Sequence, residues 1–366
     1  MFHPTVRSSR PRIRAGLTAL AGALLVLLAA CGGGDNANAA ESTTTSSTTT
    51  TSSSTTTTTE PPALSALTGL PVDDEAVLER PVIAAKISSD RAAQPQVGLS
   101  TADWVIEEVV EGGISRFLAV FQSTESDPVG PIRSARTSEV ELLPLFGRPI
   151  FVHSGGNQGT IRALSASQTL SAGHNSAFGH LYYRDRSRRG PNNLFTDTSA
   201  IREAVGDDAA APGELFRFLD RDDDPPHHAL PVSGVDLSFG STRTRWVWDA
   251  DQGAFLRWQD GREHLDPDNF QLAFPTVVVL ATRYQTSAAD PRSPEAVSVG
   301  SGDAWVLSDG WVVAGTWERS TPDSPYVLRD PDGEEIALAP GRIWLALPRT
   351  GEGNIEFLDA DPREEQ

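Results

Sequence analysis

The sequence predicts a mixed α+β (α/β) fold: a layered, mixed-sheet N-terminal domain followed by a smaller, mainly β C-terminal domain. Between residues 81 and 205, short apolar segments typical of strands alternate with helix-like segments. After residue 240, strand-like segments follow one another and are separated by turns that contain Gly and Asp. A chain of 366 residues is long enough for two domains of roughly 100–200 residues each. We place these domains at residues 63–235 and 236–352.

The N-terminus, residues 1–30, is a predicted signal peptide. Four arginines precede the apolar run LTALAGALLVLLAA, which is shorter than the about 20 residues that a bilayer span needs. The residues Leu28-Ala29-Ala30-Cys31 resemble the lipobox of bacterial lipoproteins. By that resemblance, Cys31 is lipid-modified after cleavage and anchors the protein to the outer, extracytoplasmic face of the cell membrane. An ordinary cleaved signal peptide is the alternative.

The next segment, residues 31–62, is a predicted disordered tether. Its uninterrupted Ser/Thr tract from Ser42 to Thr59 has nothing apolar to bury. Residues 353–366 are expected to form a flexible tail. The formal charge of −19 argues against nucleic acid as a partner, because phosphate binding needs basic patches. Cys31 is the only cysteine, so the body of the chain has neither a disulfide nor a cysteine nucleophile.

The N-terminal domain begins with predicted strands. Residues 81–88 and 114–123 are short apolar runs with Pro, Gly or polar residues at their ends, as buried strands have. Residues 100–110 fit either a helix or a strand. Residues 148–164 predict a strand, a Gly-rich turn and a helix in succession. This order favours a layered domain.

Two further helices are expected from their start signals. Pro131 suits the first turn of a helix, and Ser138 with Glu141 has the spacing of a capping box. Pro144 should keep this helix short. Ser134 or Ser138 can cap this helix. A second helix is expected to run to Val205, and Thr198 or Ser199 can cap it.

The C-terminal domain has hairpin signals. Residues 243–258 predict two strands around an Asp-Gln-Gly turn, and residues 303–319 predict a hairpin with Asp309-Gly310 at its turn. A second turn is expected at Asp332-Gly333, and residues 274–284 contain a strongly apolar strand. Four tryptophans are expected in the core rather than on an exposed sugar platform: Trp305, Trp311, Trp317 and Trp344.

Motifs of the common catalytic classes are absent from the sequence. It contains no G-x-S-x-G, P-loop, G-x-G-x-x-G, H-E-x-x-H or EF-hand pattern. His174 and His180 are not at a metal-ligand spacing, and His227 and His228 are adjacent, so their side chains should rarely converge on one ion. We therefore predict no metal and no cofactor. Whether the chain is an enzyme stays open, and a non-catalytic protein is favoured over an enzyme.

The segment FVHSGGN has the layout of a site, with a buried strand leading into a Gly-rich turn before a helix. His153 can act as an acid or base, Ser154 can donate a hydrogen bond, and Gly155 and Gly156 let the backbone approach a ligand. Asn157 lies at the helix start, where N–H groups favour anions. The alternative is a structural turn in which His153 is hydrogen-bonded to the backbone.

Three arginines are the second candidate feature. Arg133 and Arg136 would share a face if their segment is helical, and Arg116 lies on a neighbouring predicted strand. Fixed guanidinium groups can clamp a carboxylate or phosphate. Asn193, in RGPNNLF, is expected to join this cleft from a following loop. The alternative is an internal network in which Glu107, Glu108 and Glu111 neutralise these arginines.

Three functions follow as hypotheses from these features. The first is a non-catalytic envelope protein that binds an anionic or carbohydrate ligand, such as a cell-wall fragment, or an envelope partner. The second is a cell-wall glycan or peptide hydrolase in which His153 is the base and Glu107 or Glu111 supplies a carboxylate. The third is a protein-docking scaffold, which a contiguous apolar patch on the C-terminal domain would favour.

Several motifs, taken in order along the chain, identify a family resemblance. The N-terminal motifs are AAQPQVGL, VGPIRSAR, FVHSGGN and RGPNNLFT, and the C-terminal motifs are GREHLDPDN and GSGDAWVLSDGWVVAGTWER. The chain resembles the YerB-type bacterial lipoproteins, a two-domain family of unknown function, over about residues 70–350. Gln94 replaces an arginine that is usual in the family. The resemblance implies a layered mixed α/β domain and a smaller second domain, tethered outside the cell, and implies no activity.

Overall fold

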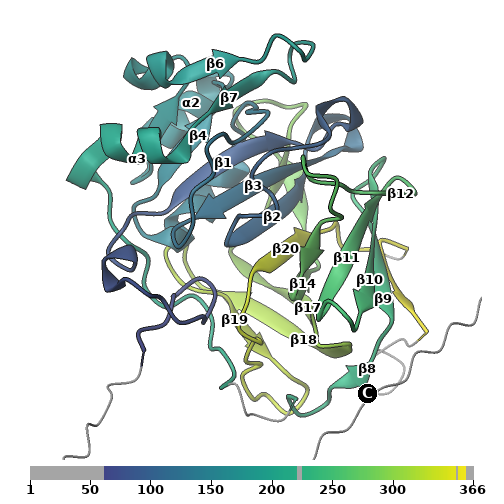
Figure 1. The fold of residues 1–366 in the computed structure, drawn as a ribbon. Coiled ribbons are helices and arrows are strands. Elements are labelled where there is room, and N and C mark those ends of the chain that lie inside the picture. Colours follow the sequence, from purple (N-terminus) through teal and green to yellow (C-terminus); the bar gives the residue numbers. More distant parts are fainter. Residues whose placement is uncertain (1–61, 221–224, 352, 360–366) are drawn as a thin grey trace, which may run out of the picture. The chain divides into compact units, whose positions relative to one another are not determined.

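The computed structural model describes residues 62–220, 225–351 and 353–359 (Figure 1). The predicted signal peptide, Cys31 and almost all of the predicted tether lie outside the described residues. Residues 353–359 of the predicted flexible tail instead contain a strand, β21 (Ile355–Leu358), which pairs with β9. None of the helices in the described ranges is long and apolar enough to cross a membrane.

The described residues, from 62 onward, form one compact unit. Its α-helices are α1 (Ser138–Leu142), α2 (Gln158–Ser165) and α3 (Thr198–Val205). Short 3-10 helices are η1 (Glu75–Val77), η2 (Arg91–Ala93), η3 (Glu111–Gly113), η4 (Leu143–Phe146), η5 (Ala177–Leu181) and η6 (Gly206–Asp208). The mixed α+β class predicted from the sequence is confirmed, with strands well in excess of helices.

The largest sheet has eleven strands in the order β19-β18-β17-β14-β20-β2-β3-β1-β4-β5, with β8 (Leu230–Pro231) paired to β18. Its other strands are β1 (Ile83–Ser88), β2 (Trp104–Val109), β3 (Ser115–Phe121), β4 (Ile150–His153), β5 (Leu170–Gly173), β14 (Thr276–Leu280), β17 (Gly300–Ser308), β18 (Trp311–Arg319), β19 (Val327–Arg329) and β20 (Ile343–Leu347). Both predicted domains contribute strands, because β20 pairs in parallel with β14 on one side and β2 on the other. The sheet therefore continues across the predicted boundary at residues 235–236.

A second, antiparallel sheet has six strands, and all of them follow residue 233. They are β9 (Gly234–Ser238), β10 (Arg243–Asp249), β11 (Ala254–Gln259), β12 (Arg262–Glu263), β13 (Ala273–Phe274) and β21. Two hairpins lie apart: β6 (Tyr182–Arg184) with β7 (Leu194–Thr196), and β15 (Tyr284–Thr286) with β16 (Pro294–Ala296). The hairpins at residues 243–259 and 300–319 confirm the predicted turns.

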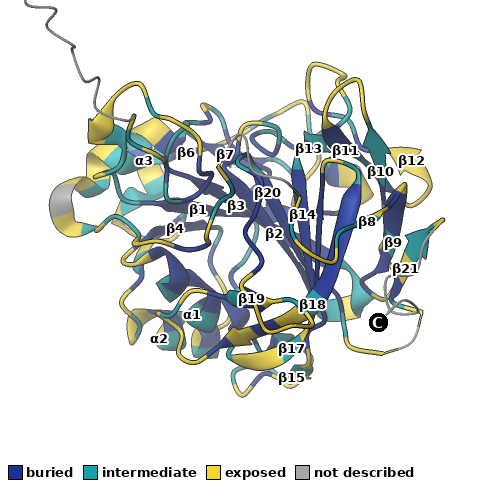
Figure 2. Ribbon diagram, turned by 90° about the horizontal axis from the view of Figure 1, so that it is seen from below, coloured by how far each residue is buried: buried dark blue, intermediate teal, exposed yellow. Residues whose placement is uncertain are grey.

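The central strands of the eleven-stranded sheet, from β14 to β4, are buried on both faces, as their dark colour in Figure 2 shows. Alternate side chains of each strand point to opposite faces, so two apolar cores form. One core joins the six-stranded sheet and α3 to one face, through side chains such as Trp246, Phe255 and Ile201. The other core joins α1, η4 and α2 to the opposite face, through side chains such as Leu142, Phe146 and Leu164. The four tryptophans expected in the core are buried there.

Two helix starts differ from the predictions. The capping box is absent, because the Ser138 hydroxyl accepts a hydrogen bond from the Ala296 amide and Glu141 accepts one from Ser298. Helix α3 begins at Thr198, so Asp197 occupies the N-cap position and makes no side-chain cap bond. The predicted caps Thr198 and Ser199 instead donate to Glu125 and Asp127. At both helix starts, partners distant in sequence thus compete with the local cap.

Candidate functional site

The segment from Pro131 to Arg136 is not helical, and the short helix predicted after Pro131 begins only at Ser138, as α1. Its backbone bonds to both neighbours: the Arg133 amide donates to the Lys86 carbonyl at 2.8 Å, and the Ser154 amide donates to the Arg133 carbonyl at 2.9 Å. This pairing inserts the segment between β1 and the turn after β4. Tertiary hydrogen bonds therefore outweigh the local helix signals, and Arg133 and Arg136 do not share a helix face.

The three arginines nevertheless gather around this segment. The Arg116 and Arg136 guanidinium groups both donate to the carbonyl oxygen of Ser134, each at 3.2 Å. Arg136 also forms an ion pair with Glu111 at 2.6 Å. Of the three carboxylates expected to neutralise this group, only Glu111 does so.

Arg133 has weaker partners. Its guanidinium donates to the Asn192 amide oxygen at 3.1 Å and lies 3.9 Å from the Asp90 carboxylate. The loop residue that reaches the arginines is therefore Asn192. The predicted Asn193 accepts a hydrogen bond from Arg184 at 2.8 Å and does not contact the arginine group.

Arg116 is a buried cation with little compensation. The residue is 6% exposed, and it has no ion pair among the described residues. Burial, together with the positive charges of Arg136 and Arg133, lowers the pKa of its guanidinium to about 10, although the Glu111 and Glu139 carboxylates oppose this shift. A buried charge without an opposite charge is costly, so this position favours an anion.

The His153 side chain is buried and hydrogen-bonded within the fold. It is 2% exposed, its Nδ1 accepts a hydrogen bond from the Gly155 amide at 3.0 Å, and its Nε2 lies 2.7 Å from the Ser171 hydroxyl. Burial lowers the pKa of His153, which keeps the imidazole neutral. Both ring nitrogens are occupied, so the alternative of a structural turn describes this histidine.

The rest of the Gly-rich turn is partly accessible. Gly155 has a φ of +116°, which L side chains rarely adopt, and Gly156 is exposed. The Asn157 side chain caps α2 by accepting from the Thr160 amide at 2.8 Å. The Ser154 hydroxyl lies 3.4 Å from the Ser134 hydroxyl, beside the carbonyl that the arginines share. Of this turn, Ser154 is thus the side chain nearest the arginines.

A fully buried ionic cluster lies beneath the same segment. The only lysine of the chain, Lys86, contacts Glu108 and lies 2.5 Å from Glu139. Burial opposes ionisation of Glu108, but the Lys86 ammonium and hydrogen bonds from Glu139, Lys86 and Ser138 together lower the pKa of Glu108. For Glu139, burial and the neighbouring Glu108 charge prevail and raise its pKa to about 7. Two carboxyl groups thus share one ammonium, and only one of them ionises readily.

A second buried network joins the two sheets. Glu107 on β2 accepts two hydrogen bonds from Arg257 on β11, both at 3.0 Å, and one from the Trp344 indole at 3.1 Å. His264 contacts Arg257 and lies 2.7 Å from the Gln96 amide oxygen. Glu107 is fully buried and therefore cannot face a substrate, which removes it from the hydrolase hypothesis.

Arg116 does not line any of five cavities identified among the described residues. Glu111 is the one candidate residue that lines any of these cavities in the described part of the chain, a polar cavity of about 310 Å³ beside Arg292 and Arg349. A groove of about 640 Å³ lies on the outer face of the six-stranded sheet. Its lining includes Trp258, Glu356 and the ion-paired Arg245 and Asp236.

Several of these residues were missed by the sequence reasoning. Asn192 had a signal, since it adjoins the predicted Asn193 in RGPNNLF, and Lys86 had one in being the only lysine. Gln96 and His264 lie in the family motifs AAQPQVGL and GREHLDPDN, and their contact gives those motifs a structural role. Trp258 had no signal, because which side of a strand remains exposed depends on the sheet packing.

Comparison with known proteins gives matches along most of the chain. Residues 67–211 match the "Protein of unknown function (DUF3048) N-terminal domain", and residues 235–345 match the corresponding C-terminal domain. The chain is 28% identical over 287 residues to the Bacillus subtilis (strain 168) protein named "Putative lipoprotein YerB", which covers 77% of this chain and 85% of that protein. The crystal structure of YerB from Bacillus subtilis matches with a TM-score of 0.71 and 24% identity, covering 81% of this chain and 100% of that one. Two domain matches in the same order, spanning well over half of its length, mean that the chain belongs to the YerB-like DUF3048 family.

Proposed function

We propose that this protein is a non-catalytic lipoprotein, anchored to the extracytoplasmic face of the membrane, that binds an anionic ligand at Arg116 and Arg133. The observation that carries the proposal is the Arg116 guanidinium, which is buried and has no ion pair among the described residues. Two other buried arginines have fuller compensation: Arg257 pairs with Glu107, and Arg319 donates to four carbonyl oxygens and one hydroxyl. A ligand anion would supply the charge that Arg116 lacks.

The neighbouring groups support a carboxylate or a phosphate as the ligand group. The surroundings of Arg116 supply further donors: the Arg133 guanidinium, the Ser134 and Ser154 hydroxyls and the Asn192 amide. Guanidinium groups bind planar or tetrahedral oxyanions with paired hydrogen bonds. The side chain of Arg133 is 17% exposed, so the anion would approach from its side. We expect recognition of one anionic group rather than enclosure of a whole ligand.

Anion binding can be tested by thermal unfolding of the purified full chain with sodium phosphate and with sodium acetate at constant ionic strength. We expect phosphate or acetate to raise the Tm of the wild type and not that of Arg116→Gln. Arg162→Gln, on the exposed side of α2, is the matched control and should respond like the wild type.

The same experiment separates the binding site from a structural network. If Arg116 serves a ligand, Arg116→Gln removes an uncompensated buried charge, so the unliganded variant should be at least as stable as the wild type. If Arg116 is structural, the variant should lose about 3 kcal/mol or more of unfolding free energy. A destabilised variant, together with a wild type that neither anion stabilises, would refute the proposal.

The membrane anchor is supported by the lipobox-like residues Leu28-Ala29-Ala30-Cys31 and by the name of the Bacillus subtilis relative. A thioether-linked diacyl chain holds a protein firmly, because each buried methylene contributes about 0.8 kcal/mol. Cys31→Ser should move the protein from the membrane fraction to the soluble fraction of cells that express it. Membrane association that survives this substitution would contradict lipidation at Cys31.

A second candidate ligand is a glycan in the groove on the six-stranded sheet. Trp258 lies on the same face as the Arg245–Asp236 pair, and sugars bind to an aromatic face flanked by planar polar groups. Trp258→Ala should weaken co-sedimentation with insoluble peptidoglycan, and Phe270→Ala, at an exposed residue outside the groove, should not. Equal binding by both variants would exclude the groove.

The scaffold hypothesis has less support, since Phe270 is the one exposed large apolar residue described after residue 235.

A further inference from the structure

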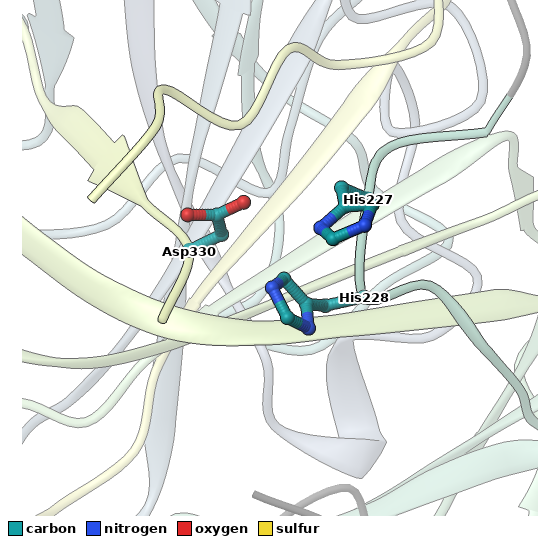
Figure 3. A group of neighbouring side chains, drawn as sticks. All are labelled: His227, His228 and Asp330. Atoms are coloured by element: carbon teal, nitrogen blue, oxygen red, sulfur yellow. The ribbon is translucent and has the colours of Figure 1, made fainter. Parts of the chain in front are cut away.

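A cluster of metal-ligating side chains lies far from the arginines. His227 and His228 come from the loop before β8, and Asp330 comes from the turn after β19 (Figure 3). Their potential ligand atoms all lie within 4.8 Å of one another. The sequence reasoning discounted the adjacent histidines, and their convergence on a third ligand is a property of the tertiary structure.

The backbone explains how neighbouring histidines converge. Consecutive side chains of an extended segment point to opposite sides. His228, however, has a φ of +65°, a left-handed conformation that is uncommon for a residue other than glycine. The two imidazole centroids are 4.4 Å apart as a result, with their planes at 75°. This conformation orients both rings toward the same turn.

The turn after β19 is ordered by its own hydrogen bonds. Oδ1 of Asp330 accepts from the amides of Asp332 at 3.0 Å and Glu334 at 2.9 Å. This arrangement fixes the Asp330 carboxylate and leaves its other oxygen available. Oδ2 of Asp332 lies 2.8 Å from Nε2 of His228 and 3.5 Å from Nδ1 of His227. Asp332 is thus positioned as a fourth ligand or as an acceptor that orients the imidazoles.

We propose that His227, His228 and Asp330, together with Asp332, form a surface site for Zn²⁺. Two imidazole nitrogens with carboxylate oxygens suit Zn²⁺, whereas Mg²⁺ and Ca²⁺ prefer oxygen ligands alone. Bonds of 2.0–2.1 Å in a tetrahedral site place the ligand atoms roughly 3.3 Å apart. Small side-chain rotations would close the present spacing, and the 80% exposed His227 side chain is free to make them.

The bound ion would link two parts of the chain. The histidines lie between residues 211 and 235, which separate the two family domains, and Asp330 lies beside an edge strand of the large sheet. Zinc would therefore tie the connecting segment to the C-terminal half, independently of any ligand at Arg116.

The test is isothermal titration of the tag-free full chain with ZnCl₂, after treatment with EDTA and its removal, in excess Mg²⁺ to occupy weak acidic sites. We expect one zinc per chain. His227→Ala should lower the zinc affinity at least tenfold without unfolding the protein, because this side chain is exposed. Asp330→Asn keeps an acceptor for the turn and should weaken binding as well. His180→Ala is the control and should bind like the wild type. Absence of saturable zinc binding, or equal affinity in His227→Ala and the wild type, would overturn the proposal.

Discussion

The buried cluster of Lys86, Glu108 and Glu139 makes the stability of the protein depend on pH, and Glu139→Gln tests it most directly. When both carboxyl groups are ionised, two negative charges share one ammonium in a fully buried site. Glutamine resembles the protonated acid in shape. It retains an acceptor for the Arg136 amide, which contacts the Glu139 carboxylate, and adds a donor that can face Glu108.

The magnitude follows from the pKa of Glu139, which is raised from 4.5 to about 7. The folded state holds a proton on this group that the unfolded state releases near pH 4.5. The stabilisation from this proton is fully present below pH 4.5 and is lost as the pH rises through 7. A shift of 2.5 units at 1.36 kcal/mol per unit corresponds to about 3 kcal/mol. We therefore expect Glu139→Gln to gain about 3 kcal/mol relative to the wild type between pH 5 and pH 8.

Urea unfolding followed by tryptophan fluorescence at pH 5, 6, 7 and 8 measures this difference. The lowered pKa of Glu108 contributes stability that is lost only as the pH falls below about 4.5, outside this range. Buried neutral histidines such as His153 and His264 make the protein less stable as the pH falls below 6.5. Both proteins contain these histidines, so this effect cancels in the comparison.

The matched control is Glu141→Gln, the same substitution on the half-buried glutamate two residues further along α1. It reports how much of the change comes from losing an acid from this helix. If the stability difference between Glu139→Gln and the wild type is the same at pH 5 and pH 8, the reasoning about the shared ammonium is wrong.

Three further predictions concern packing. Arg257→Ala leaves the Glu107 carboxylate buried without its partner and should cost about 3–5 kcal/mol in urea unfolding; a loss below 1 kcal/mol would contradict the inter-sheet role. Gly173→Ala would place a Cβ 2.7 Å from the imidazole of His153, and we expect a loss of about 1–3 kcal/mol, checked by the Tm. Gly310→Ala combines a φ of +76° with a Cβ 2.8 Å from a tryptophan indole, and it should lower the Tm by several degrees, whereas an unchanged Tm would show that this turn adapts.

The strands were predictable from the sequence to the extent that their signals are local. The apolar run at 81–88 and the Asp309-Gly310 turn gave β1 and the β17–β18 hairpin, because a buried strand and a two-residue hairpin turn are defined by neighbouring residues. The helix expected after Pro131 begins only at Ser138, because backbone groups of the preceding residues find partners on β1 and in the turn after β4. Local signals indicate what a segment can form and do not indicate which distant partner it meets.

The candidate site shows the same division. The sequence alone predicted that the arginines and the Gly-rich turn belong together. It also determined the family through the order of its motifs, the mixed α+β class, and the absence of cysteine chemistry in the folded part. Only the tertiary structure decided that Glu111 pairs with Arg136, that Glu107 pairs with Arg257 and that Arg116 has no acidic partner among the described residues. The physical reason is strand order: β20 lies between β14 and β2, and the side chains that meet in the interior are set by this long-range arrangement rather than by spacing along the chain.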